Sequence, residues 1–237
     1  FFEPDNLVAA VRVLRASEYA VHVAQGRVGE RLCCGRTHLS VGDVAAARAK
    51  GRTLVDALAP LAERGLAIVG LEPSCLLTMR DELLALGLGP AAQTVAKQAL
   101  LFEEFLERET REGRFTPAFR RPGRPLRVHG HCHQKAFGAF EPVLALLRRL
   151  PGADVAAIES SCCGMAGHFG YETSHLEASR QMAEAALLPA VRSAPGAIIV
   201  ADGTSCRHQI AGGAGREALH VARVLADLLH EATTGET

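Results

Sequence analysis

Short apolar runs alternate with amphipathic stretches along the chain, and the alternation occurs twice. The apolar runs are typical of strands in a parallel sheet that helices cover on both faces. They lie at residues 19–23, 66–71, 126–129, 154–158 and 197–201. Apolar positions at three- and four-residue spacing predict helices. These lie at residues 7–16, 41–64, 101–106, 143–150, 173–193 and 219–224.

The tripeptide Cys-Cys-Gly also occurs twice, at residues 33–35 and 162–164. Each copy is followed about forty residues later by another cysteine, Cys75 or Cys206, just after an apolar strand. A motif that recurs in the same structural setting indicates an internal repeat. We therefore predict an α/β fold of two pseudo-repeated halves, with parallel β-strands flanked by helices.

The repeat suggests three segments. Residues 1–112 form the first repeat and residues 126–237 the second, and residues 113–125, which contain three prolines, form a linker between them. Ligand sites in parallel sheets collect at the carboxyl ends of the strands. Both Cys-Cys-Gly loops, and the loops with Cys75 and Cys206, are predicted to lie at such ends.

Composition narrows the class of protein. The 237 residues are 48% hydrophobic and carry no formal net charge, which gives no electrostatic argument for binding nucleic acid. No apolar run approaches the roughly 20 residues of a membrane span. Seven cysteines clustered in motifs argue against a secreted disulfide framework, so we expect a cytoplasmic protein or one peripheral to the inner membrane. The opening Phe1-Phe2-Glu3-Pro4 suggests a piece of a longer polypeptide.

Four cysteines of the second repeat are predicted to converge at one sheet edge. Cys132 follows the strand at residues 126–129, and Cys162, Cys163 and Cys206 follow the two later strands. Four thiolates suit an iron–sulfur cluster or a tetrahedral zinc ion. The adjacent pair favours the cluster, because separate iron atoms can accept neighbouring thiolates, whereas one zinc would need both on a single tetrahedron. The other interpretation is that these cysteines are small buried hydrophobic residues.

The motifs give a specific resemblance. The sequence resembles the cysteine-rich CCG domain at His129, Cys132 and His133 and in four longer strings. These strings are Cys-Cys-Gly-Arg-Thr, Glu-Pro-Ser-Cys, Glu-Ser-Ser-Cys-Cys-Gly-Met-Ala-Gly and Gly-Thr-Ser-Cys. That domain occurs in heterodisulfide reductase, in the iron–sulfur component of glycolate oxidase and in the small component of anaerobic glycerol-3-phosphate dehydrogenase. The sequence is most similar to one branch, the C-terminal region of FAD-linked oxidases that resemble D-2-hydroxyglutarate and D-lactate dehydrogenases.

The chain departs from the family pattern at the two downstream motifs. The first cysteine of the family's Cys-x-x-Cys is Glu72 in the first repeat and Gly203 in the second. Cys132, Cys162, Cys163 and Cys206 therefore remain as ligands for one 4Fe-4S cluster, with zinc as the alternative. The first repeat keeps Cys33, Cys34 and Cys75 and has no upstream cysteine in this chain. It is either a second metal site, with His38 as a candidate fourth ligand, or a degenerate copy.

Several polar residues lie near the predicted cluster. His131 and His133 flank Cys132 and are candidates for hydrogen bonds to cluster sulfur, which tune reduction potential. The other interpretation is that they are strand-end histidines bonded to the backbone. The cationic residues Arg36, Lys135 and Arg207 place positive charge near the cysteine loops, where they would offset cluster charge or hold an anionic substrate. His168 and Tyr171 follow the second motif and are candidates to line the same site.

The resemblance implies an electron-transfer role. In such an enzyme FAD on another domain or subunit oxidises a D-2-hydroxy acid, and the cluster passes electrons to a quinone or a ferredoxin-type acceptor. No flavin or nicotinamide motif is visible in this chain. The alternatives are a structural docking module that binds zinc or no metal, and a catalytic cluster domain like that of heterodisulfide reductase.

Overall fold

The computed structural model describes residues 3–26 and 31–230. The elements of the first repeat are α1 (Pro4–Arg15), α2 (Arg36–Ser40), α3 (Val44–Glu63), β1 (Ile68–Gly70), α4 (Pro73–Arg80), α5 (Glu82–Ala85), α6 (Pro90–Gln98), β2 (Ala99–Leu101) and α7 (Phe102–Arg111). Those of the second are β3 (Leu126–His129), α8 (Cys132–Ala136), α9 (Glu141–Arg148), β4 (Val155–Ala157), η1 (Phe169–Tyr171), η2 (Thr173–His175), α10 (Leu176–Glu184), α11 (Leu187–Arg192), β5 (Ile198–Ala201), α12 (Thr204–Ala214), β6 (Ala218–Leu219) and α13 (Val221–Leu228).

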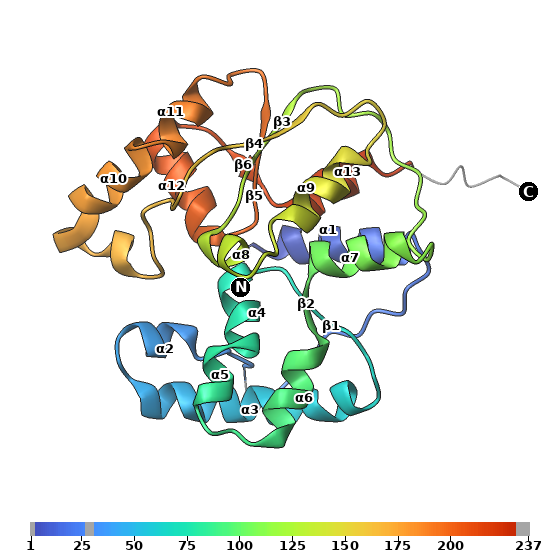
Figure 1. The fold of residues 1–237 in the computed structure, drawn as a ribbon, viewed down its shortest axis with the longest axis vertical. Helices are drawn as coiled ribbons and strands as arrows, with labels where there is room; N and C mark the ends of the chain where they lie inside the picture. The colour runs from blue at the N-terminus through green and yellow to red at the C-terminus, as the bar shows by residue number, and fades with distance from the viewer. Residues whose placement is uncertain (1–2, 27–30, 231–237) are drawn as a thin grey trace, which may run out of the picture.

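All the strand pairs within the two sheets are parallel, which confirms the predicted α/β class. The larger sheet has the order β4-β3-β5-β6, and Leu126 of β3 lies opposite both Val155 and Ile198. The smaller sheet pairs β1 with β2. Parallel strands end at a common edge, so β4, β3 and β5 deliver the loops that follow them to one place (Figure 1).

The second part of each repeat follows the same plan. A strand leads into a helix with a cysteine near its start, α4 after β1 and α12 after β5. A second parallel strand then leads into a closing helix, α7 after β2 and α13 after β6. The correspondence that the sequence predicted between these strands and helices is therefore present in the structure.

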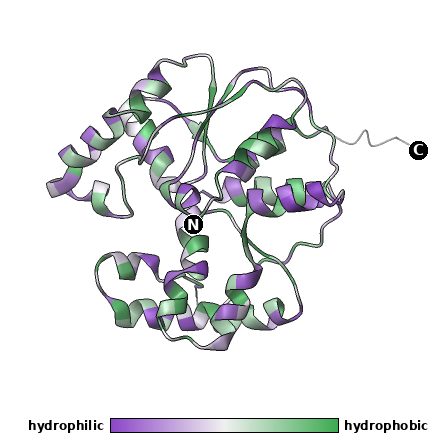
Figure 2. Cartoon of the chain, viewed as in Figure 1, coloured by the Kyte–Doolittle hydropathy of each residue, from purple (hydrophilic) through white to green (hydrophobic). Residues whose placement is uncertain are grey.

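The two repeats exchange helices across a shared core. Helix α1 packs against α13, the closing helix of the second repeat, and α9 packs against α7, the closing helix of the first. One hydrophobic cluster joins residues of both repeats, including Val13, Phe102, Leu126 and Val200. Figure 2 shows that these helices are amphipathic, with green apolar residues beside purple polar ones along α7. Burial of this common core holds the two cysteine-bearing regions together.

The strand predicted at residues 19–23 is wrong. This segment has no regular secondary structure, although Tyr19 and Val21 pack against the main core. The segment is mostly apolar, but a strand also needs a neighbour with which to pair, and in the described residues β1 pairs only with β2. The Tyr19 hydroxyl instead donates a hydrogen bond of 2.9 Å to Glu109.

The single helix predicted at residues 173–193 is also wrong, because the structure divides it. A short 3-10 turn, η2, leads into α10, and α11 begins separately after Ala186, whose φ of −155° is far from helical. Pro189 explains the break. A proline cannot donate the backbone hydrogen bond to the carbonyl four residues earlier, and its ring crowds that carbonyl. The long helix predicted at residues 41–64 is confirmed as α3.

The segment between the repeats is anchored to the second. Phe115 is buried, and Phe119 forms an antiparallel bridge with Leu229. The Arg124 guanidinium donates to the carbonyls of Gly196 and Ala197. Within residues 3–26 and 31–230, no helix is both long and apolar enough to cross a bilayer.

Candidate metal centre

The four cysteines predicted as ligands meet at the carboxyl edge of the larger sheet. Cys132 is the first residue of α8, and Cys206 lies in the first turn of α12. Cys162 and Cys163 lie in the loop after β4. Cys163 and Cys206 are buried, whereas Cys132 and Cys162 are partly exposed. Three neighbouring strands therefore bring four thiols to a site that is open on one side.

The thiols form a chain of sulfur contacts. Cys132 interacts with Cys162, Cys162 with Cys163, and Cys163 with Cys206, and each interaction shifts the pKa of both thiols. The interaction with Cys132 lowers the pKa of Cys162 to about 2, and the interaction with Cys163 holds the pKa of Cys206 well below its usual value. The same interactions raise the pKa of Cys132 and of Cys163. Neighbouring sulfur atoms therefore shift one another's pKa in opposite directions, and binding a cation would favour the thiolate form of all four.

Gly164 makes the adjacent cysteines possible. Its φ is +87°, and a Cβ at this position would lie 2.2 Å from the backbone oxygen of Ser179 in α10. The tight turn directs the amide of Gly164 at the Cys162 sulfur, 3.3 Å away. Any other residue would be strained in both backbone conformation and packing.

His129, which ends β3, joins the cysteine site. Its ring nitrogen, Cys163 Sγ and Cys206 Sγ all lie within 4.8 Å of one another, and all three residues are buried. No other set of three His, Cys, Asp or Glu residues in the described part of the chain is arranged in this way. In the sequence, His129 is one of three histidines that alternate around Cys132, and nothing in the pattern distinguishes it from His131 and His133.

The two histidines predicted to tune the cluster occupy different surroundings. His131 caps α8, and its Nδ1 accepts the backbone N–H of His133 at 3.1 Å and lies 3.9 Å from Cys132 Sγ. His133 faces the first repeat, with Nε2 3.4 Å from the Arg36 guanidinium. Burial, followed by His131 and Arg36, lowers the pKa of His133. His131 is therefore placed beside a candidate ligand, and His133 at the contact between repeats.

His131 also occupies space next to the missing cysteine of the second repeat. A Cβ on Gly203 would lie 2.4 Å from His131 Cδ2 and 3.2 Å from Cys206 Sγ. A side chain at position 203 would require the imidazole to move. The departure from the family's Cys-x-x-Cys is thus accompanied by a histidine ring that fills the space.

The cysteines of the first repeat form a smaller and more exposed group. A hydrogen bond with Cys75 lowers the pKa of the buried Cys34 to about 7, and raises that of Cys75. Cys33 and Cys75 are exposed. His38, the candidate fourth ligand, lies 3.5 Å from Asp43 through Nδ1. Unlike the second repeat, this group has no buried histidine beside its thiols among the described residues.

Polar contacts join the two cysteine regions. Figure 1 shows α8 next to α4 where the two repeats meet, and these helices are in contact. The carboxylate of Glu72 accepts the Ser74 hydroxyl at 2.7 Å and, from the other repeat, the backbone N–H of Thr204 at 2.9 Å. Ser40 Oγ lies 3.0 Å from His168 Nδ1. The residue that replaces the first repeat's missing cysteine therefore stabilises the starts of both cysteine-bearing helices.

A buried polar network lies behind the site and was not predicted. The amide of Gln134 donates to Glu103 at 2.5 Å and to Asp202 at 3.0 Å, and its oxygen accepts the His131 backbone N–H. Burial and the neighbouring Asp202 hold the pKa of Glu103 well above its usual value. The network fixes α8 against the β5–α12 turn.

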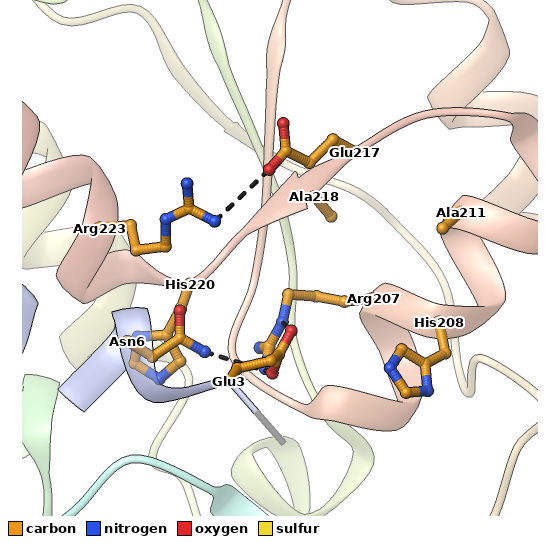
Figure 3. A pocket seen from close by; sticks show the side chains of 9 residues that line it. All are labelled: Glu3, Asn6, Arg207, His208, Ala211, Glu217, Ala218, His220 and Arg223. Carbon is orange, nitrogen blue, oxygen red and sulfur yellow. Dashed lines mark hydrogen bonds and ion pairs between the residues drawn. The ribbon is translucent and has the colours of Figure 1, made fainter. Parts of the chain in front are cut away.

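The predicted cations serve as structural anchors. Arg207 donates to the carbonyls of Ala201 and Asp202 and forms an ion pair with Glu3. Figure 3 shows this arginine in a cavity of about 150 Å³, with Glu3 and Asn6 beside it. Lys135 donates to the carbonyl of Ser160, and Arg36 pairs with Glu82. These three side chains bond to carbonyl and carboxylate oxygens of the protein itself. This arrangement gives no support to a role in binding an anionic substrate.

Comparison with known proteins agrees with this geometry. Residues 126–211 match the family model of the CCG cysteine-rich domain, and this segment contains all four converging cysteines. The predicted resemblance to this domain is confirmed.

Two groups of curated proteins are similar over most of the chain. One subunit of the anaerobic glycerol-3-phosphate dehydrogenase of Escherichia coli (strain K12) is 26% identical over 227 residues, 92% of this chain and 54% of that protein. The D-2-hydroxyglutarate dehydrogenase of Pantoea ananatis (strain AJ13355) is 30% identical over 187 residues, 77% of this chain and 17% of that protein. The E. coli (strain K12) D-2-hydroxyglutarate dehydrogenase is 30% identical over 177 residues, 73% of this chain and 17% of that protein. The chain thus spans about half of the first relative and about a sixth of the others.

Proposed function

We propose that this chain is the iron–sulfur electron-transfer module of an FAD-linked D-2-hydroxy-acid oxidoreductase. One cluster would be held by Cys132, Cys162, Cys163 and Cys206. The single observation that carries the proposal is the convergence of these four thiols at one sheet edge, inside the segment that matches the CCG domain.

The residues present suit an iron–sulfur cluster. The chain of sulfur contacts supplies soft anionic ligands, and the adjacent pair can address separate iron atoms. The site is buried on the side of Cys163 and Cys206 and more open at Cys132 and Cys162. Such a centre accepts and releases single electrons, and its open side provides a direction for transfer.

The protein would set the reduction potential through the surroundings of the sulfur atoms. The Gly164 amide donates to Cys162 Sγ, and such hydrogen bonds raise the potential because they stabilise the more negative, reduced state. Burial of Cys163 and Cys206 acts in the opposite direction, because it disfavours added negative charge. The raised pKa of Glu103 behind the site favours its uncharged form.

The rest of the reaction belongs to a flavin-containing domain or subunit. There the 2-hydroxy acid would lose a hydride to FAD and a proton to a base, giving the 2-oxo acid and reduced flavin. Electrons would leave the flavin singly through the cluster to a quinone or ferredoxin-type acceptor. The relatives named for D-2-hydroxyglutarate support the substrate class. We place the assembly in the cytoplasm or at the inner membrane surface.

A second candidate is a docking module that binds zinc. The observation that favours it is the group of His129, Cys163 and Cys206, because an imidazole with thiolates is also a common zinc donor set. A zinc ion there would stabilise the fold and carry no electrons.

Metal analysis of the anaerobically purified chain separates the two functions. The proposal predicts about four iron atoms with matching acid-labile sulfide per chain, and a broad visible absorption that dithionite bleaches. Stoichiometric zinc, or no metal after reconstitution with iron and sulfide, would contradict it. A second test adds the reconstituted chain to its reduced flavoprotein partner, where bleaching of the cluster should accompany reoxidation of the flavin.

A further inference from the structure

Three histidines alternate around Cys132, and each ring has a different hydrogen-bond arrangement. A neutral imidazole has one N–H donor and one lone pair, so the partner of one nitrogen fixes what the other can do. The partners of His129, His131 and His133 therefore show which of the three has a lone pair to give to a metal.

His129 has its donor satisfied and its lone pair unused. Its Nδ1 lies 2.9 Å from Ser160 Oγ, and the Ser160 hydroxyl donates its own proton to the carbonyl of Ile158. The serine oxygen therefore accepts from Nδ1–H, which leaves the lone pair on Nε2. That nitrogen is buried and makes no hydrogen bond of ordinary geometry among the described residues, and His129 helps to lower the pKa of the neighbouring Cys206 thiol. A buried acceptor without a partner is costly unless a ligand satisfies it.

One nitrogen of the His129 ring forms a group with Cys163 Sγ and Cys206 Sγ, and the three atoms all lie within 4.8 Å of one another. Because Nδ1 is bonded to Ser160, Nε2 is the nitrogen left to face this group. Histidines that ligate metals typically hold the metal through one nitrogen and donate the other N–H to a fixed acceptor, as His129 does to Ser160. We infer that His129 is a direct ligand of the metal centre through Nε2, beside Cys163 and Cys206. This inference rests on the proposed function, namely that this edge binds a metal cluster.

The other two histidines have already used their lone pairs. Nδ1 of His131 accepts the backbone N–H of His133, so its Nε2 carries a proton and can only donate. Nε2 of His133 faces the Arg36 guanidinium, which has no acceptor, so this nitrogen is the one that accepts. Neither ring can ligate a metal through the nitrogen concerned without losing the bond that holds it in place.

A histidine ligand also accounts for how the site does without the family's missing cysteine. Gly203 occupies the position of that cysteine, and the His131 ring fills the space next to Gly203. His129 supplies a further donor from β3 instead of from the β5–α12 turn. A neutral imidazole in place of a thiolate makes the centre less negative by one charge, which favours the reduced state.

Electron-nuclear coupling provides the test. The full chain is grown with ¹⁴N- or ¹⁵N-labelled histidine, reconstituted anaerobically with iron and sulfide, and poised in the oxidation state that gives an electron paramagnetic resonance signal. A directly bound imidazole nitrogen gives a strong coupling that changes with the isotope. We expect this coupling in the wild type and in H131A, its matched control, and its loss in H129A. In H129C, where a thiolate replaces the imidazole, iron content should persist and the potential should fall.

The outcomes distinguish a failure of the His129 ligand assignment from a failure of the proposed cluster. An iron-loaded wild type without strong nitrogen coupling, or an H129A variant that retains it, overturns the ligand assignment and leaves the cluster proposal in place. A wild type that takes up no iron overturns the proposed function itself and the ligand assignment with it. Because H129C keeps a ligand at the position, an unfolded H129A does not prevent the test.

Discussion

The two Cys-Cys-Gly turns share a backbone geometry but differ in what surrounds them. Gly35 and Gly164 have φ values of +81° and +87°, and each amide lies close to the first cysteine sulfur, at 3.4 and 3.3 Å. A Cβ at either glycine would collide with a backbone oxygen of a following helix. The turn is thus built in the same way in both repeats, and it does not by itself make a four-ligand site.

The difference comes from the neighbouring strands. In the second repeat, β3 lies between β4 and β5, and it brings His129 and Cys132 to the adjacent cysteines. The described part of the first repeat contains only β1 and β2, the counterparts of β5 and β6. The ligand set therefore depends on a strand adjacent to the turn.

Alanine at the two turn glycines should strain both turns but reduce metal binding in only one. G35A and G164A each place a side chain at positive φ, which costs about 1–3 kcal/mol before the collision with backbone oxygen is added. Chemical denaturation should show both variants destabilised by at least that amount. Iron content should fall in G164A alone. Equal iron loss in both variants would mean that the first turn also holds metal.

Removal of the Glu72 carboxylate should weaken the junction between the repeats. E72A deprives Ser74 and Thr204 of an acceptor at the starts of α4 and α12, and loss of a helix cap costs about 1 kcal/mol. D43A is the matched control, because Asp43 is exposed, caps α3 and otherwise contacts His38 within the same repeat. The free energy of unfolding should fall further in E72A than in D43A. Equal losses would show that the bond to Thr204 contributes nothing.

The smallest effect should come from the segment that did not form a strand. Residues 19–23 are held partly by the Tyr19 bond to Glu109, whose pKa the Arg114 guanidinium lowers to about 2. A carboxyl with a depressed pKa stabilises the fold above its usual pKa of 4.5, and this contribution is lost as pH falls from there towards 2.

Acid unfolding measures this contribution. The wild type should lose stability between about pH 4.5 and 2, and E109Q should show a shallower decline over the same range. Y19F should retain most of the slope, because the arginine contact remains, and should lose less than about 1 kcal/mol at neutral pH. An unchanged slope in E109Q would show that Glu109 is not the group responsible.

Much of the site could be predicted because the repeat is recognisable from short sequence motifs. The cysteines, the glycines and the apolar strands before Cys75 and Cys206 recur at matched positions, and each has a local structural meaning. Residues 19–23 look like a strand, but pairing depends on a neighbour that local sequence does not supply. The division of residues 173–193 could have been read from Pro189, whose missing N–H and crowding ring outweigh the helical period.

The role of His129 could not be read from the pattern alone. Three histidines alternate around Cys132, and sequence gives no reason to prefer one as a ligand. Only the structure shows that Ser160 lies beside Nδ1 of His129, while backbone and Arg36 use the lone pairs of the other two. The same holds for Gln134, which joins Glu103 and Asp202 from distant parts of the chain.

Whether the second repeat alone holds the cluster is tested by the iron and sulfide content of two matched variants beside the wild type. C163S removes a buried cysteine of the second repeat, and C34S removes the corresponding buried cysteine of the first. The account predicts that C34S keeps the wild-type content of about four irons and four sulfides, whereas C163S loses most of both. Equal loss in the two variants, or full retention in C163S, would contradict a single cluster held by the second repeat.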